Sequence, residues 1–483
     1  MKKSLLVVLL LLLCTGVGIW AAAAYIYRPH DQVTFTEETV SGDPSAAEGL
    51  TVRAQAQYNH RLFWDSVCRV GEEPQTETAY AFYPDQHQTD RPASYAGVEM
   101  DNGGYGSTAF AASGGFETEE MGAYGLNAAY RELADQTAPG AEGEKVIRVS
   151  DYLDYYPLEV RLDFPEFLLD LNRMMDWGTD GGEETKAVPL LQTFQNFFRI
   201  PVLEEERMEI SIGKDPSGGI NSWGSGSVSE YDSFYLWTES VVAGSTCYFT
   251  FDCHTEQDHV VDTSQIPGGY GIYRLTCQYD PERMGSELER VDIEELSMVY
   301  PLDPNGYLLE LGLSGDGERL LVHTREEDTY VLTVVDLEDL STVQRLEITP
   351  DEKDWSWCYV FQEEDYLAIT MGEQVALLVQ QEGGVYQEAF LTDVEEDAIW
   401  QNFQDMDYDG RHLAVTGVYD FDEGKIDYYN SRDGQSFYLA VYSPEGLEYY
   451  GLYRSSLDVT GKEENYRDYC HPVSYHPLCV SWP

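Results

Sequence analysis

The chain has 483 residues, of which 43% are hydrophobic and 13% aromatic, so it carries enough apolar material for a large folded core. Its 87 acidic side chains outnumber 29 basic ones and give a formal net charge of −58. A field of that sign attracts cations and basic partners and repels nucleic acid, so the composition excludes a nucleic-acid-binding function. The same charge is also typical of an acidic surface that only keeps a secreted protein soluble.

The first predicted element is a run without charged residues at positions 5–27, which follows Lys2 and Lys3. At a rise of ~1.5 Å per residue, such a run is long enough to cross a hydrocarbon core of about 30 Å. The positive charges ahead of it favour a cytoplasmic N-terminus. We therefore expect residues 1–28 to form a cytoplasmic N-terminus and a transmembrane signal anchor, which contacts the lipid bilayer and leaves the remaining chain extracytoplasmic at the cell membrane.

Two other fates of this segment stay open. Ala22 and Ala24 form an A-x-A pattern, so that cleavage near Ala24 would release a secreted protein. Attachment of a lipid at Cys14 is a further alternative, although Leu13 precedes it where a small residue is expected. Residues 29–48 are rich in polar and turn-forming residues and predict a membrane-proximal linker.

Residues 49–200 contain stretches that alternate apolar and polar side chains. This pattern predicts either N-terminal blades of a larger β fold or a separate β-rich domain. Within it, residues 101–145 are rich in Gly, Ala and acids and predict a long surface insertion. Apolar faces that follow Pro165 and Pro189 predict two helical insertions.

A pattern of apolar strands recurs between residues 300 and 455. Each copy has an acidic or Gly-containing turn, an apolar strand, a β-branched strand and a final alternating strand, and Leu320, Leu367 and Leu413 occupy equivalent positions. One such unit cannot bury both faces of its small sheet, whereas units stacked around an axis can. A β repeat of 40–50 residues therefore predicts a propeller.

The segment Ser314-Gly-Asp-Gly-Glu-Arg-Leu-Leu-Val, followed by Val-Val-Asp-Leu at 334–337, resembles the blade signature of WD40-like and TolB-like β-propeller repeat proteins. Asp409-Gly-Arg-His-Leu-Ala-Val matches the same turn, whereas the Trp-Asp dipeptide and Gly-His pair of true WD40 repeats are absent. The resemblance implies an all-β propeller. At about 46 residues per blade, the chain beyond the anchor predicts six to eight blades with small helical insertions, behind one N-terminal transmembrane helix. Residues 201–483 would then form blades and a C-terminal tail. Propellers serve many functions, so the resemblance concerns the fold alone.

Asp405, Asp407 and Asp409 stand at alternate positions directly before Gly410. Carboxylates in this pattern, followed by a Gly that permits a sharp bend, can surround Ca²⁺ with oxygen ligands. The acid that an EF-hand loop requires at its twelfth position is replaced by Thr416, which excludes a helix–loop–helix site. The three aspartates are the candidate metal site, for Ca²⁺ as cofactor, and the alternative is a solvated acidic turn.

Cys470 and Cys479 flank a tail segment that also contains His471 and His476. In an extracytoplasmic compartment we expect a disulfide between the two cysteines, with unpaired thiols or a zinc site as alternatives. An antiparallel hairpin centred near residue 262 would place Cys247 opposite Cys277. A second disulfide is predicted there, and two ordinary buried cysteines are the alternative.

The sequence contains no nucleophile elbow, zinc-protease motif, P-loop or dinucleotide-binding glycine motif. It therefore predicts a membrane-anchored extracytoplasmic β-propeller that acts as a binding, scaffolding or sensory module for a protein, peptide or glycan ligand. The alternative is an extracytoplasmic glycan-active or other hydrolase or lyase with its site in the propeller channel, because propeller enzymes often lack linear motifs. No catalytic residue can be assigned from the sequence.

Overall fold

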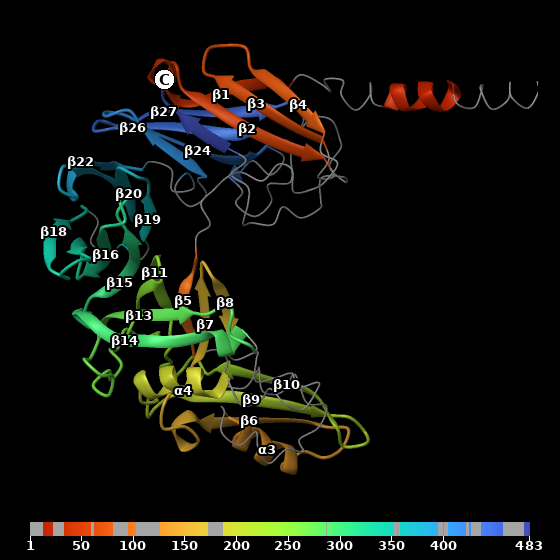
Figure 1. The fold of residues 1–483 in the computed structure, drawn as a ribbon, viewed down its shortest axis with the longest axis vertical. Helices are drawn as coiled ribbons and strands as arrows, with labels where there is room; N and C mark the ends of the chain where they lie inside the picture. The colour runs from red at the N-terminus through yellow and green to blue at the C-terminus, as the bar shows by residue number, and fades with distance from the viewer. Residues whose placement is uncertain are drawn as a thin grey trace, which may run out of the picture.

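The computed structural model (Figure 1) describes residues 13–22, 33–58, 62–80, 95–102, 126–171, 187–285, 287–351, 355, 358–394, 399, 404–421, 425–426, 436–456 and 478–483. Within the expected anchor, residues 13–22 are helical, and the rest of residues 5–27 lies outside the described residues. None of the described helices is long and apolar enough to cross a membrane. The anchor therefore stays a prediction.

The described strands form seven antiparallel sheets, of which three have four strands in simple chain order. These sheets are β11 (Thr238–Ala243), β12 (Thr246–Phe251), β13 (Gly271–Tyr279) and β14 (Val291–Pro301); β15 (Tyr307–Leu313), β16 (Arg319–Glu326), β17 (Thr329–Asp336) and β18 (Thr342–Ile348); and β19 (Cys358–Gln362), β20 (Tyr366–Met371), β21 (Gln374–Gln381) and β22 (Val385–Asp393). The second and third of these sheets correspond to copies of the repeat expected from the sequence, whereas the β11–β14 sheet lies upstream of the expected copies.

The other sheets combine strands that are farther apart in the chain. They are β28 (Leu478–Ser481), β2 (Thr51–Tyr58), β3 (Leu62–Arg69) and β4 (Gln75–Tyr80); β5 (Gly97–Asp101), β7 (Glu159–Phe164) and β8 (Phe167–Asp170); β10 (Ile220–Ser227), β9 (Arg207–Lys214) and β6 (Glu142–Arg148); and β1 (Phe35–Gly42), β27 (Gly446–Ser455), β26 (Phe437–Ser443), β24 (Leu413–Asp420) and β23 (Asp405–Tyr408), with β25 (Lys425–Ile426) beside β24.

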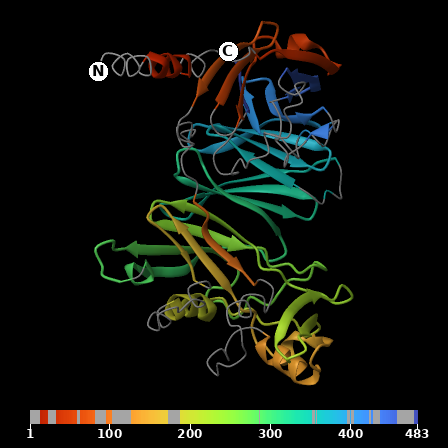
Figure 2. The same ribbon diagram turned by 90° about the vertical axis from the view of Figure 1, so that its right-hand side faces the viewer.

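The sheets follow one another along an open arc, with the first strand of each repeat sheet on its inner side and the last on its outer side (Figures 1 and 2). The inner strands β11 and β15 pack against each other, as do β15 and β19. Blades of a β-propeller are arranged in this way, because each small sheet buries its faces against its neighbours. The fold is all-β and propeller-like, and the resemblance to propeller repeat proteins is confirmed.

Strands from distant parts of the chain complete two of the sheets. β28 pairs with β2, so that Val480 lies opposite Val52. β1 adds to the edge of β27, with Phe35 opposite Ser455. Each of these sheets therefore takes most of its strands from one half of the sequence and one strand from the other half, which holds the two halves together.

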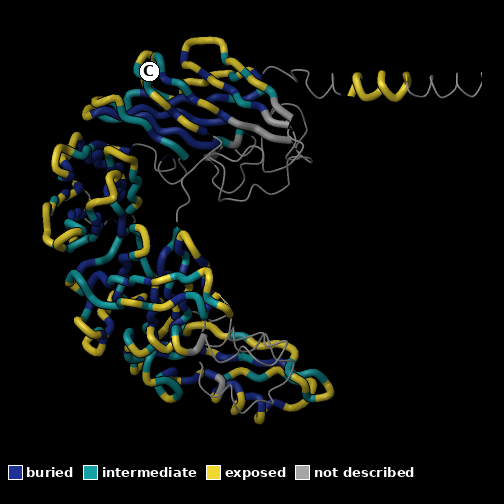
Figure 3. Tube along the Cα trace, in the orientation of Figure 1, coloured by how far each residue is buried: buried dark blue, intermediate teal, exposed yellow. Residues whose placement is uncertain are grey.

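The equivalence of Leu320, Leu367 and Leu413 is confirmed. They lie near the start of β16, β20 and β24, each the second strand from the inner edge of its sheet. Each is at most 1% exposed. Figure 3 shows the same pattern along the repeat sheets, where buried strands run between exposed turns.

The helical insertions follow the predictions only in part. The helix α4 (Ala187–Phe197) contains Pro189 in its first turn, as expected. The predicted helix after Pro165 is wrong, because the chain turns there into β8, in which Phe167 is buried and Leu168 exposed at the period of a strand. The expected surface insertion also includes the helix α3 (Asn127–Gln136), whose Tyr130 is fully buried.

Candidate ligand site at the inner strands

Aromatic and charged side chains gather where three inner strands begin. Trp237 directly precedes β11, Tyr307 is the first residue of β15, and Trp355 lies shortly before β19. Because neighbouring strands are antiparallel, β12 and β16 end at this same side and add residues 252–254 and Arg325. We name this region the inner-strand site.

A stack of rings and one guanidinium group forms part of the inner-strand site. The rings of His254 and Tyr307 are parallel, with centroids 4.0 Å apart. The Arg325 guanidinium lies 4.4 Å from the Tyr307 ring centroid and 5.5 Å from that of Trp355. Its Nη1 donates to the Trp355 carbonyl oxygen at 2.8 Å. These cation–π contacts and this hydrogen bond hold adjacent sheets in register.

Two exposed aromatic side chains lie in the segment that leads into β11. Tyr235 and Trp237 are 50% and 71% exposed, while the alternating residues Phe234 and Leu236 are buried. The amide of Asn102, which is itself buried, fixes this extended segment. Its Nδ2 donates to the Phe234 carbonyl oxygen at 2.6 Å, and its Oδ1 accepts from the Leu236 N–H at 2.9 Å. The aromatic pair is therefore presented to solvent from a held backbone.

Two half-buried carboxyl groups lie on the adjacent inner strands β11 and β15. Glu239 is on β11 and accepts a hydrogen bond from Trp237, and Glu310 is on the adjacent strand β15. Burial raises the pKa of Glu310 from 4.5 to about 8, and the negative charge of Glu239 adds to this shift. Burial likewise raises the pKa of Glu239, and the hydrogen bond from Trp237 opposes that change. Among the described residues, no basic side chain contributes to either pKa shift.

Buried polar groups surround Glu310 on the neighbouring strands. His323 lies directly opposite it on β16 and is fully buried. The Nδ1 of His323 is 2.6 Å from the Tyr330 hydroxyl, and its Nε2 has no hydrogen-bond partner in the described part of the chain. Burial lowers the pKa of His323 to about 3, so the imidazole is neutral. Burial raises the pKa of the Cys358 thiol on β19, and the charge of Glu310 adds to this shift.

This arrangement can act chemically in two ways. At neutral pH Glu310 keeps its proton, because its pKa is about 8. A ligand cation would replace that proton, since a nearby positive charge favours an ionised carboxylate, and Trp237 would offer the face of its ring to the same cation. Alternatively, the protonated Glu310 can donate its proton to a bound molecule.

The sequence reasoning missed these residues, although one signal pointed to them. Glu310 interrupts the apolar stretch Tyr307-Leu-Leu-Glu-Leu-Gly-Leu, where a charged residue is unusual. Glu239 similarly precedes Ser-Val-Val. An acid inside an apolar inner strand is a better indicator of a site than an acid in a turn. That position, however, becomes visible only once the sheets are assembled.

The candidate calcium residues serve other contacts. The Oδ2 of Asp405 accepts from the Val480 N–H at 2.7 Å, and the Oδ2 of Asp407 accepts from the Trp482 N–H at 2.6 Å. The Trp482 indole also donates to the Asp407 carbonyl oxygen at 3.1 Å. These two carboxylates therefore attach the segment of β28 to β23.

Asp409 points to a different partner. Its carboxylate accepts from the backbone N–H groups of Arg411 and His412, both at 2.7 Å, and lies 3.0 Å from the His412 ring. Within the described residues, the only group of three side chains arranged to hold a metal ion lies elsewhere, at residues 252–254. The structure thus does not group the three aspartates as metal ligands. The calcium site stays a prediction, and the contacts of these side chains agree better with the acidic-turn alternative.

The cysteines also differ from the expected pairing. The β12–β13 hairpin places Cys247 opposite Leu275, so the predicted register of Cys247 and Cys277 is wrong by two residues. Both are buried free thiols in the structure, as the alternative had it. The turn between the strands is not symmetric about residue 262, because residues 252–270 form an irregular excursion after β12. Cys470 lies outside the described residues, and its disulfide with Cys479 stays a prediction.

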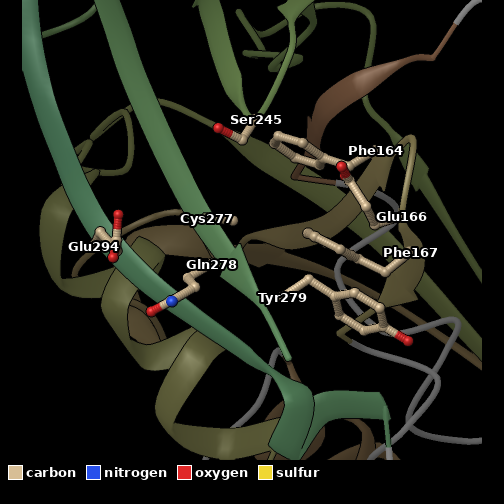
Figure 4. Close-up of a pocket in the computed structure, with 8 residues that line it drawn as sticks. All are labelled: Phe164, Glu166, Phe167, Ser245, Cys277, Gln278, Tyr279 and Glu294. Carbon is tan, nitrogen blue, oxygen red and sulfur yellow. The ribbon is translucent and has the colours of Figure 1, made fainter. Parts of the chain in front are cut away.

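A separate cavity of about 300 Å³ lies between the β7–β8 hairpin and the strands β13 and β14 (Figure 4). Phe164 and Phe167 stack there with centroids 5.1 Å apart, and Phe167 lies 5.7 Å from Tyr279. Burial raises the pKa of the Cys277 thiol to about 12, so it is a poor nucleophile. The full lining is Phe164, Glu166, Phe167, Ser245, Cys277, Gln278, Tyr279 and Glu294. It is a weaker candidate than the inner-strand site, because its aromatic rings pack on one another and are not placed beside a pair of buried carboxyl groups.

Comparison with known proteins concerns the fold and not the chemistry. No protein-family model and no curated protein matches this chain. Among solved structures, a 6-phosphogluconolactonase candidate from Bacteroides fragilis shares 11% identity over 84% of this chain and 95% of its own, with a TM-score of 0.31. A protein from Lactobacillus plantarum shares 8% identity over 90% of this chain and 98% of its own, with a TM-score of 0.28. The Cps50 (Swd1) β-propeller domain of Myceliophteria thermophila shares 8% identity over 53% of this chain and 70% of its own, with a TM-score of 0.24.

Proposed function

We propose that this chain is a membrane-anchored extracytoplasmic binding module whose inner-strand site binds a basic peptide. The observation that carries the proposal is the pair Glu239 and Glu310 on adjacent inner strands, beside the exposed Trp237. An ammonium or guanidinium group would lie against the indole ring and satisfy both carboxylates. The net charge of −58 would attract such a ligand from a distance.

No described basic side chain contributes to the pKa shifts of Glu239 and Glu310. Two carboxyls held close in a partly dry environment repel each other when both are ionised, so one stays protonated. A ligand cation removes that repulsion and supplies the positive charge that no described residue provides. Binding should therefore strengthen as the pH rises through the Glu310 pKa of about 8, because the proton then no longer competes.

The test uses a tetralysine peptide and isothermal titration calorimetry on the purified full-length chain. Ionic strength is kept near 0.15 M, where a Debye length of about 8 Å suppresses diffuse attraction to the acidic surface. The double variant Glu239→Gln/Glu310→Gln should bind at least about tenfold more weakly, which corresponds to about 1.4 kcal/mol. The matched control Glu382→Gln/Glu388→Gln makes the same two substitutions at exposed positions, with Glu382 in the turn before β22 and Glu388 on β22.

The two variants separate a specific site from a general charge effect. If both double variants weaken binding equally, the peptide binds to diffuse acidic surface and the proposal fails. It also fails if the Glu239→Gln/Glu310→Gln variant binds as tightly as the unmodified chain. Trp237→Ala supplies a further check, since loss of the ring contact should weaken binding without altering the charge.

One observation favours an enzyme as the second candidate. A carboxylic acid that keeps its proton at neutral pH, beside a second carboxyl, is the arrangement in which a glycoside hydrolase protonates its leaving group. Glu310 would be the acid and Glu239 the second carboxyl. Release of reducing sugar from polysaccharide, abolished in Glu310→Gln, would support this activity. Unchanged release in that variant would exclude Glu310 as the acid.

The membrane address is supported by the sequence alone, through the uncharged run at positions 5–27 and the lysines ahead of it. An extracytoplasmic propeller fixed near the membrane would meet soluble basic peptides directly.

A further inference from the structure

We infer that Asp252, Cys253 and His254 form a site for a zinc-type divalent metal ion. Their ligand atoms, one from each side chain, lie within 4.8 Å of one another. They belong to the excursion after β12 and lie within the inner-strand site, but they include neither Glu239 nor Glu310, so this inference does not depend on the proposed peptide ligand.

The donor set matches the chemistry of zinc. A thiolate, an imidazole and a carboxylate are the ligand types that Zn²⁺ takes, and three protein ligands leave a fourth position for water. Calcium and magnesium prefer oxygen ligands only, so the cysteine excludes them as the preferred ions. Among the described residues, this is the only such group of three.

The backbone holds the three residues before any ion arrives. The Val261 N–H donates to the Cys253 carbonyl oxygen at 2.9 Å, and the His254 N–H donates to Asp252 Oδ1 at 3.1 Å. The ring of His254 is fixed between Asp252, whose Oδ1 is 2.6 Å from its Nδ1, and the parallel ring of Tyr307. Contacts of this kind orient metal ligands and reduce the entropy lost on binding.

The three side chains differ in how far they are buried. Cys253 is fully buried, the His254 side chain is 5% exposed, and the Asp252 side chain is 35% exposed. An ion would therefore enter past Asp252. The Cys253 thiol donates only a weak bond to the Pro304 carbonyl oxygen at 3.4 Å, and the Tyr270 side chain hydrogen-bonds to its sulfur.

Binding is balanced by the release of one proton. The metal replaces the hydrogen on Cys253 Sγ, which becomes a thiolate ligand, while the imidazole nitrogen and the carboxylate oxygen each bind through a lone pair. Because binding releases this proton, affinity should rise with pH.

The test titrates Co²⁺, a spectroscopic substitute for zinc, into the full-length chain after treatment with a chelator. One equivalent should produce the intense near-ultraviolet absorption of a cobalt–thiolate bond, and Zn²⁺ should remove it. Cys253→Ser should abolish this absorption. Cys277→Ser is the matched control, because Cys277 is also a buried thiol with its pKa raised to about 12, and it should leave the absorption unchanged.

Asp252→Asn covers the case in which Cys253→Ser fails to fold, because its side chain is the most exposed of the three. It should weaken Co²⁺ binding at least about tenfold. The inference is overturned if the unmodified chain gives no thiolate absorption, if Cys253→Ser retains it, or if Asp252→Asn binds Co²⁺ as tightly. The Glu239→Gln/Glu310→Gln variant should keep the cobalt absorption while it loses tetralysine binding, so failures of the two proposals are distinguishable.

Discussion

Replacing Glu310 with glutamine should change how the stability of the protein depends on pH. The folded-state pKa of Glu310 is raised from 4.5 to about 8. A raised pKa means that the folded state holds the proton more tightly than the unfolded state does. The contribution of this proton to the free energy of unfolding is fully present below about pH 4.5 and is lost as the pH rises to about 8. Each tenfold change in proton affinity corresponds to about 1.36 kcal/mol, which gives an upper limit of about 5 kcal/mol. Solvent around a half-buried group reduces that value.

The amide of the Glu310→Gln variant cannot ionise, so the variant avoids this loss at high pH. The charged and titratable groups around the position are Glu239 on β11, His323 and Arg325 on β16, Tyr330 on β17 and Cys358 on β19. None of them pairs with the Glu310 carboxylate as a cation. Replacing Glu310 should therefore cost the least stability at high pH, where the carboxyl of the unmodified chain is charged.

The measurement is the thermal midpoint of both chains at about pH 5 and about pH 9. For a chain of this length that unfolds as one unit, about 1 kcal/mol shifts the midpoint by about 1 °C. The thermal midpoint of the variant, relative to that of the unmodified chain, should therefore rise by up to about 5 °C from pH 5 to pH 9. Glu388→Gln, at an exposed position on β22, controls for the change in net charge. If the difference in thermal midpoint between Glu310→Gln and the unmodified chain is the same at both pH values, burial does not raise the pKa of Glu310 in the folded state.

Three further outcomes are expected. Leu320→Ala should destabilise the fold by ~2–5 kcal/mol through a core cavity, whereas Leu168→Ala, at a 50% exposed position, should have little effect on the thermal midpoint. Asp407→Asn removes a charged acceptor 2.6 Å from the Trp482 N–H and should lower the free energy of unfolding by about 1.5–3 kcal/mol. The loss should be the same in millimolar calcium and in millimolar magnesium. A rise in the thermal midpoint that is specific to calcium and absent in the variant would instead support the metal site. Protease added to intact cells should remove the domain beyond residue 28, and full protection would contradict the extracytoplasmic address.

The repeat sheets could be predicted because their information is local. Leu320, Leu367 and Leu413 recur at a nearly constant spacing, and each begins a strand with apolar residues on both faces. The failed helix after Pro165 shows the limit of this reasoning. A short apolar run fits a helix face or a buried strand equally, and contact with neighbouring strands decided for β8.

The candidate site could not be predicted in the same way, because its residues come from different repeats. Glu239 and Glu310 are distant in sequence and meet only when β11 packs on β15. Their pKa values depend on burial, which no residue pattern specifies. The register of Cys247 failed for a related reason, since the irregular residues 252–270 shift the hairpin by an amount that alternation alone does not show.

Acidic side chains on the inner strands have opposite roles, according to what faces them. Asp405 and Asp407 meet backbone N–H groups of the segment around β28, and such donors satisfy an ionised carboxylate. Glu239 and Glu310 are buried near each other, and no described cation contributes to their pKa shifts, which favours the protonated form. The first pair completes the fold, whereas the second can gain stability only from a proton or a ligand. Net charge alone therefore could not locate a binding site in this protein, and the donors offered by the neighbouring strand are what distinguish a structural acid from a functional one.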